Sequence, residues 1–318
     1  MKAFTRNVLT YSASIHPSAE QLESLLPKFD DSTPLAASEV QRVGFVPLAD
    51  ERVVLPIGPS WATGLRIDRK SVPGSAVRRA LSDRIERITK TQGFAPGRKQ
   101  AKEIKEYVVA ELTRKALVTS TVVPVLYSFQ RCALYIAGST KAADLVLNAL
   151  VNTLEAVEFK TTVIDSVSQG LTARLSNYAA EADDAFGRFE VGSSVVLENN
   201  EGHRWAIKQH DLARAYETLQ EALADDAQVH SIELELPTST DTPIVFRFTN
   251  KLRVVGIKHG DSDPENECAD DLQAAKISQL ALELGNLDAI WSGLMELFDT
   301  EAVQGRASTR EDDGADLF

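Results

Sequence analysis

The chain has 318 residues, 43% of them hydrophobic and 25% charged, so it has the composition of an ordinary globular protein and the length of two or three domains. Its two cysteines, Cys132 and Cys268, lie far apart, which excludes a disulfide framework or a cysteine-based zinc site and favours a reducing cytoplasm. No stretch approaches the ~20 apolar residues that span a bilayer, so we expect a soluble, cytoplasmic protein with no membrane partner.

The formal net charge of −12 is distributed unevenly along the chain. Residues 261–318 hold 15 acids and three bases, whereas residues 66–115 hold 14 bases and six acids. The acidity therefore belongs to the last part of the sequence, and the region 66–115 is a basic segment of net charge +8. A positive segment of this size predicts an anionic partner, and a row of cations along a helix suits a row of phosphates.

The first 70 residues predict short strands and one helix. A strand-like stretch covers 3–11, and a short helix follows Pro17, with Ser14 or Ser18 near its N-cap and Pro27 at its end. Three further stretches are rich in β-branched residues, are broken by Pro and Gly, and predict a small antiparallel meander: 43–48, 52–57 and 61–70.

The basic segment predicts two helices joined by a turn. One helix begins at Ser75 and has an apolar stripe at Val77, Leu81, Ile85 and Ile88; the turn TQGFAPG (91–97) ends it. A second helix covers about 98–117, with Ala101, Ile104, Val108 and Leu112 on one side. Arg98, Lys102 and Lys105 share a neighbouring face, so we expect a hairpin with one packed face and one positive face.

The remainder alternates strands and helices. Residues 119–128 and 131–138 predict a β-hairpin, and Ser139 caps a helix that precedes a strand at 159–164. A helix at 167–178 is followed by strand-like stretches at about ten-residue spacing, which are 187–198, 203–209, 230–237, 242–250 and 251–258. Helices are expected at 211–224 and 269–298, and an acidic disordered tail from Asp299.

No motif in the chain predicts catalysis. GFAPGRK (93–99) has three residues between its glycines where a phosphate-binding loop has four, so it is better explained as an inter-helix turn. The acidic stretch 261–271 lacks the glycine and the final glutamate of a calcium loop. His16, His203, His210, His230 and His259 show no ligand spacing. We therefore expect no enzyme activity, no metal site and no cofactor.

The basic hairpin has an ordinary alternative explanation, since Lys and Arg on helix faces often form solvated i,i+4 pairs with Glu. Two observations favour an anion-binding surface instead. Bases outnumber acids by eight within the segment, and the face of Arg98, Lys102 and Lys105 carries no acid. Binding of this kind neutralises phosphates irrespective of base sequence, so it predicts non-specific, salt-sensitive association.

With these residues in view, the chain resembles the bacterial recombination-associated RdgC family up to about Phe298. The resemblance is carried by the order and spacing of several segments: VGFVPL (43–48), VPGSAVRRALSDRIERI leading to GRKQAKEIKEYVVAEL, LYIAGSTKAADLVLNAL, WAIKQHDL (205–212) and the stretch from FRFTNKLRVVGIK to LDAIWSGLMEL. It implies an elongated, horseshoe-like α+β monomer with antiparallel sheets, which closes into a ring-shaped homodimer. The implied function is non-sequence-specific binding of double-stranded DNA, in the nucleoid, that restrains the RecA recombinase, without catalysis or cofactor.

The resemblance also implies domains and site residues. We expect a central body of residues 1–72 and 119–165, a basic helical tip of 73–118, a base domain of 166–298 and the acidic tail of 299–318. The expected DNA contacts are Arg78, Arg87, Arg98, Lys99, Lys102, Lys105, Lys208 and Gln209, and the expected dimer contacts are Leu117 and Val118. Where the family pattern can place a Phe at the tip contact this chain has Leu117, which loses aromatic packing.

Two other classes of function remain open from the residues alone. The first is a protein-interaction module whose acidic last segment mimics DNA and captures a basic partner. Deleting 299–318 separates it from the DNA-binding hypothesis, which predicts equal or tighter DNA binding after the deletion. The second is a nuclease with an unrecognised site, which incubation of plasmid DNA with Mg²⁺ would reveal.

Overall fold

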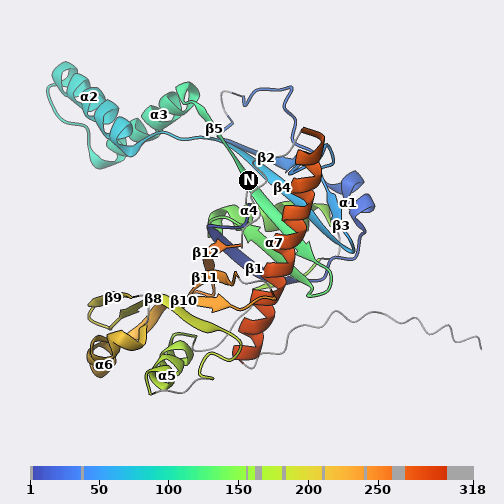
Figure 1. Cartoon of the computed structure of the whole chain (residues 1–318). Helices are drawn as coiled ribbons and strands as arrows, with labels where there is room; N and C mark the ends of the chain where they lie inside the picture. Colours follow the sequence, from blue (N-terminus) through green and yellow to red (C-terminus); the bar gives the residue numbers. More distant parts are fainter. Residues whose placement is uncertain are drawn as a thin grey trace, which may run out of the picture. The chain divides into compact units, whose positions relative to one another are not determined.

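Helices and antiparallel strands make up the protein (Figure 1). The computed structural model describes residues 3–36, 39–154, 157–161, 167–180, 184–209, 212–239, 242–259 and 269–298. Within them the strands are β1 (Asn7–Ala13), β2 (Gln41–Val46), β3 (Leu55–Ile57), β4 (Ser60–Lys70), β5 (Val118–Ser128), β6 (Ala133–Ala137), β7 (Phe159–Thr161), β8 (Glu190–Glu198), β9 (Arg204–Lys208), β10 (Gln228–Leu236), β11 (Ile244–Thr249) and β12 (Val254–Lys258). The helices of the same residues are α1 (Ala19–Leu25), α2 (Gly74–Gln92), α3 (Arg98–Lys115), α4 (Thr140–Thr153), α5 (Val167–Ala179), α6 (Tyr216–Ala224) and α7 (Ala269–Leu297), with a 3-10 turn η1 (Leu212–Ala215). The predicted α+β class is confirmed.

The chain divides into two compact units. The larger unit consists of Met1–Leu26, Pro47–Thr63 and Pro124–Phe318, and the smaller unit consists of Pro27–Val46 and Gly64–Val123. Residues 261–268 of the predicted acidic stretch 261–271 and the predicted tail at 299–318 lie outside the described residues, whereas residues 269–271 begin α7. The division into body, tip and base stays a prediction.

Strand β1 joins the two halves of the sequence within the larger unit. Val8 of β1 lies opposite Ala137 of β6 on one side and opposite Val254 of β12 on the other. Beyond β12 the antiparallel order continues with β11, β10, β8 and β9. The resemblance implies antiparallel sheets in the plural, whereas the described strands of both halves belong to one sheet. The pattern of a strand shows which face it buries, whereas its partner is chosen by packing with distant residues.

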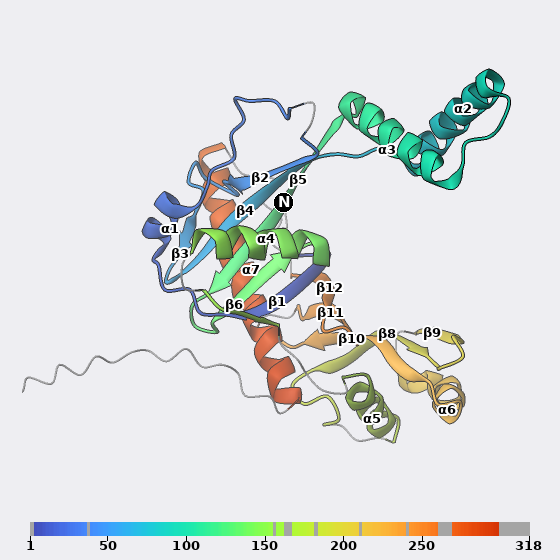
Figure 2. The same cartoon turned by 180° about the vertical axis from the view of Figure 1, so that it is seen from behind.

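Helices α4 and α7 cover opposite faces of the sheet near β1 and β6, as the two views show (Figures 1 and 2). Successive side chains of a strand point to opposite faces. In β6, Tyr135 therefore points toward α7, where its hydroxyl donates a hydrogen bond of 2.7 Å to Asp288. Its neighbours Leu134 and Ile136, both fully buried, point to the other face. The sheet is thus packed on both sides in this region.

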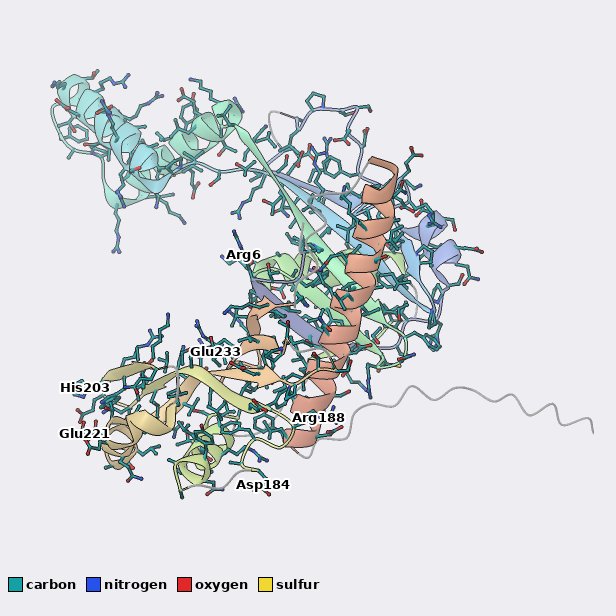
Figure 3. The ribbon with its side chains drawn as sticks, in the orientation of Figure 1. Arg6, Asp184, Arg188, His203, Glu221 and Glu233 are labelled. Carbon is teal, nitrogen blue, oxygen red and sulfur yellow. The ribbon has the colours of Figure 1, made fainter. Side chains whose placement is uncertain are left out.

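Helix α7 has 29 residues, so its axis is about 43 Å long. Its apolar face consists of buried side chains at Leu280, Leu284, Leu287, Ile290, Leu294 and Leu297. Gly293 allows close approach, because a Cβ there would lie 2.5 Å from Cζ of Phe189. Phe189 in turn meets Phe246 of β11 edge to face, with ring centroids 5.5 Å apart. The loop before β8 therefore packs closely against α7. An ion pair between Arg188 of this loop, labelled in Figure 3, and Glu296 of α7 adds a second contact.

Polar groups on α7 hold the segment before β1. The carboxylate of Glu283 is buried and accepts hydrogen bonds from the backbone N–H of Ala3 (3.2 Å) and Phe4 (3.3 Å). Gln279 donates to the same carboxylate at 3.0 Å, and the carbonyl of Phe4 lies 2.9 Å from Nε2 of His259. Buried polar groups need such partners, so these bonds attach the beginning of the chain to α7.

In the smaller unit, β2 and β4 pair antiparallel, with Gln41 opposite Arg69. The chain leaves β4 at Lys70, forms α2 and α3, and returns in β5. Gly93 ends α2 in the left-handed conformation, with φ 81°, and its N–H donates to the carbonyl of Thr89 at 2.8 Å. The predicted hairpin of two helices is therefore confirmed, although α2 extends to Gln92 and shortens the predicted turn from 91–97 to 93–97.

Candidate nucleic-acid interface

The two helices of the hairpin pack mainly on each other. Val108 of α3 is the one buried side chain among their described residues, with 4% of its surface exposed. The predicted stripe of α2, from Val77 to Ile88, is half-buried against it. Arg84 of α2 lies over the ring of Tyr107 of α3, 5.1 Å from its centroid. A small apolar seam thus holds the hairpin together and leaves most side chains in solvent (Figure 3).

Six of the predicted contact residues lie on this hairpin, and all six side chains are exposed: Arg78 and Arg87 on α2, and Arg98, Lys99, Lys102 and Lys105 on α3. Lys90 and Lys115 of the same helices form i,i+4 ion pairs, with Glu86 at 2.7 Å and Glu111 at 3.2 Å. Among the described residues, none of the six forms an ion pair with an acid. Their charges are therefore available to an outside anion.

The helix termini add to the positive field. Neither α2 nor α3 has an acid in its first turn or a side chain that caps its N-terminus. The first turn of α3 instead begins with Arg98 and Lys99. Backbone N–H groups at a helix N-terminus carry partial positive charge, so two cations beside them are unfavourable unless an anion is close.

Not every base of the segment 66–115 is available to bind an outside anion. Arg66 pairs with Asp68 at 2.9 Å and with Asp31, and its guanidinium lies over the ring of Phe29. The pKa of Asp68 is lowered, chiefly by the hydrogen bond from Arg66. Lys70 is buried, with its ammonium 2.6 Å from the carbonyl of Ala36. These two bases stabilise the smaller unit, so charge counting along the sequence overstates the anion-binding surface.

A groove runs beside α3, and we refer to it as the α3 groove. It encloses about 550 Å³, and its lining includes the cations of Lys102, Lys105 and Arg114. A second, smaller hollow of about 320 Å³ lies beside Arg84 and Arg87 of α2. Sequence reasoning missed Arg114 as a site residue, because it lies twelve residues after Lys102, about a third of a turn around α3 from the predicted face.

Lys208 and Gln209 belong to the larger unit, at the end of β9, and both side chains are exposed. The N–H of Gln209 donates to the carbonyl of Ser193 at 2.9 Å, which fixes the backbone there. Arg204 lies on the same face of β9 as Lys208, because strand side chains alternate and Ile207 is buried. The alternation of side chains in RWAIK (204–208) already places Arg204 and Lys208 on one face, and the sequence analysis missed Arg204.

The predicted dimer contacts lie at the start of β5 in the smaller unit: Leu117 directly precedes the strand and Val118 is its first residue. Leu117 has 88% of its surface exposed and Val118 has 42%. Exposed apolar side chains of this size are candidates for contact with another molecule.

Other sites are sparse in the described part of the chain. It contains no group of three or more His, Cys, Asp or Glu side chains arranged to hold a metal ion. None of its helices combines the length and the apolar composition needed to cross a membrane. Cys132 is buried and free, and Cys268 lies outside the described residues.

Comparison with known protein families gives a match over residues 3–301, to the model described as "RdgC: Putative exonuclease, RdgC". The match covers nearly all of the 318 residues. The chain belongs to the RdgC family. The resemblance expected from the sequence is thus confirmed.

Curated members of the RdgC family are similar to this chain over different lengths. The "Recombination-associated protein RdgC" of Dechloromonas aromatica (strain RCB) is 24% identical over 274 residues, which are 82% of this chain and 85% of the relative. The protein of the same name from Cupriavidus pinatubonensis is 28% identical over 202 residues, 62% of this chain and 65% of the relative. The one from Bordetella pertussis is 31% identical over 145 residues, 45% and 47% of the two chains. RdgC relatives are therefore named for recombination, while the family model is named for an exonuclease.

Proposed function

We propose that the chain binds double-stranded DNA without sequence preference and thereby restrains RecA-mediated recombination. The observation that carries the proposal is the exposed face of α3, where Arg98, Lys102 and Lys105 have no acidic partner among the described residues. Cations spaced along a helix attract phosphates through charge alone, and such contacts carry no base readout. The name of the curated relatives, "Recombination-associated protein RdgC", supports the proposed link to recombination.

The proposal includes a homodimer closed into a ring that encircles or coats the duplex. Leu117 and Val118 support this part, because their exposed apolar surface is available for a second copy. Lys208 and Gln209 are proposed as further DNA contacts in the larger unit. RecA is restrained in this proposal by occupation of the duplex, without a requirement for direct contact, and the protein acts in the nucleoid.

The test is binding of the full chain to a short labelled duplex of random sequence across a salt series. We expect log K to fall linearly with log salt concentration, with a slope of about −0.9 for each phosphate contacted. Two duplexes of unrelated sequence should give the same line. Binding that is absent at low salt, or that differs strongly between the sequences, would overturn the proposal.

The description of the family model favours one second candidate, an exonuclease. It is separated from binding by incubating end-labelled linear duplex and closed circular plasmid with the chain and Mg²⁺. We expect both substrates to keep their length, because the α3 face acts on phosphates through charge alone. Shortening of the linear substrate in proportion to the amount of chain would establish the exonuclease.

A further inference from the structure

The α3 groove combines two kinds of chemistry that DNA does not satisfy together. Its apolar part consists of Val40, Val109 and Ala110, and Val40 and Val109 have 50% and 37% of their surfaces exposed. Its charged part consists of Lys102, Lys105 and Arg114, against the single acid Glu106. Phosphates would neutralise the cations and leave the apolar part in water. The groove therefore fits a ligand that carries both carboxylates and apolar side chains.

The sequence itself contains a segment of this composition. Residues 311–318 read EDDGADLF, in which four acids, Glu311, Asp312, Asp313 and Asp316, precede the apolar pair Leu317 and Phe318. The net charge of −4 complements the groove's excess of two positive charges, and Leu317 and Phe318 match its apolar part. Residues 299–310 connect the segment to Phe298, and twelve residues reach up to about 40 Å when extended.

We propose that residues 311–318 bind in the α3 groove. Leu317 and Phe318 lie against Val109 and Ala110, and the acids pair with Lys102, Lys105 and Arg114. The segment comes from a second copy of the chain. Because Lys102 and Lys105 are needed by both ligands, the segment and DNA exclude each other. This exclusion rests on the proposed DNA binding, whereas the docking itself does not.

Docking is tested by a photo-crosslinking amino acid at Val109 in the full chain, followed by digestion and mass spectrometry. The matched control carries the crosslinker at Val151, an exposed valine on α4 with 50% of its surface accessible. We expect crosslinks from Val109 to peptides within 311–318, several-fold more abundant than those from Val151. Leu317→Ala with Phe318→Ala should reduce them, as should replacing the four acids by amides. Equal yields from Val109 and Val151 would overturn the proposal. With isotope-labelled and unlabelled chains mixed, we expect crosslinks that join the two labels, and crosslinks confined to one label would overturn the second copy as the source.

Exclusion is tested by duplex binding of the full-length variant Glu311→Gln, Asp312→Asn, Asp313→Asn, Asp316→Asn. We expect it to bind about two- to tenfold more tightly at low salt, as expected on losing a tethered competitor of 0.1–1 mM affinity at about 1 mM effective concentration. Specific crosslinks without DNA binding by either chain would contradict the proposed function and leave the docking intact. Equal DNA binding by both chains, together with no specific crosslink, would contradict the docking and leave the proposed function intact.

Discussion

The hydroxyl of Tyr135 on β6 donates a 2.7 Å hydrogen bond to the carboxylate of Asp288 on α7, and Ser128 of β5 donates another of the same length. Burial raises the pKa of Asp288, and the hydrogen bonds from Tyr135 and Ser128 oppose the rise only in part. The carboxyl group is therefore easier to keep protonated in the folded protein than in the unfolded chain.

This pKa gives the free energy of unfolding a defined pH dependence. A carboxyl group whose pKa is raised by folding adds stability at low pH, and that contribution is lost as pH rises through its folded pKa. Asp288→Asn removes the ionisation and keeps the size of the side chain. We expect the stability of the variant relative to the parent to increase as pH rises from about 3, below the ordinary pKa of an aspartate, to neutral pH, by at most about 1.4 kcal/mol for each unit of pKa elevation. Urea unfolding of both chains at several pH values measures this, and a constant difference would contradict it.

Neutralising two cations of the α3 face should weaken DNA binding and its dependence on salt. For Lys102→Gln with Lys105→Gln we expect the slope of log K against log salt to become shallower by about 1.8, since each lost phosphate contact removes about 0.9. The matched control is Lys141→Gln with Lys160→Gln, which removes two exposed lysines outside the hairpin. Equal slopes in the two double variants would count against the α3 face as the contact surface.

Lys208 tests the contact proposed in the larger unit. Because its side chain is exposed at the end of β9, Lys208→Ala should leave the fold unchanged. We expect a loss of duplex affinity and a slope shallower by about 0.9, and we expect Lys208→Arg to restore the slope because it keeps the charge. Fluorescence anisotropy across a salt series measures both variants. If Lys208→Arg shows the same salt slope as Lys208→Ala, the positive charge of Lys208 does not account for its contribution to binding.

Self-association should depend on Leu117. Its side chain is 88% exposed, so Leu117→Asp removes apolar contact area for a partner without disturbing a core. We expect sedimentation velocity to show a lower dimer fraction for this variant, and a higher one for Leu117→Phe because an aromatic ring buries more area. Leu25→Asp, at an exposed leucine of α1 with 50% of its surface accessible, is the control. A dimer fraction unchanged by Leu117→Asp would remove this residue from the interface.

Truncating Val108, the one buried side chain among the described residues of α2 and α3, should lower the local stability of the hairpin. Val108→Ala removes buried methyl groups and should cost about 1.5–3 kcal/mol of local stability. Hydrogen exchange of the amides in α2 and α3 should accelerate, while exchange in the sheet of the larger unit stays the same. The neighbouring Val109→Ala, at an exposed position, serves as the control and should change little. Equal acceleration in both variants would mean that the Val108 seam does not hold the hairpin.

Local patterns predict the elements of this fold well and their partners poorly. The capping box of Ser18 and Gln21, the turn at Gly93 and the cap at Ser139 all depend on neighbouring residues, and the structure has each of them. The pairing of β1 with β12 depends on residues that are far apart in sequence, so no local pattern contains it. The candidate site divides in the same way. Periodicity placed Arg98, Lys102 and Lys105 on one face, but only the contacts show that Arg66 and Lys70 stabilise the fold instead.

The central position of β1 has a consequence for how the protein is made. Val8 finds its partner Val254 only after almost 250 further residues have left the ribosome. At about 5–20 residues per second, the first strand waits roughly 12–50 seconds for that neighbour. Throughout this interval the edge of β1 that will pair with β12 is open to other strands. Strand β6, which is synthesised about halfway through, covers the other edge of β1, and β7 pairs with Tyr11–Ala13, so only Asn7 and Val8 wait for β12. Late release of the second half should therefore be the slowest and most aggregation-sensitive stage of biosynthesis.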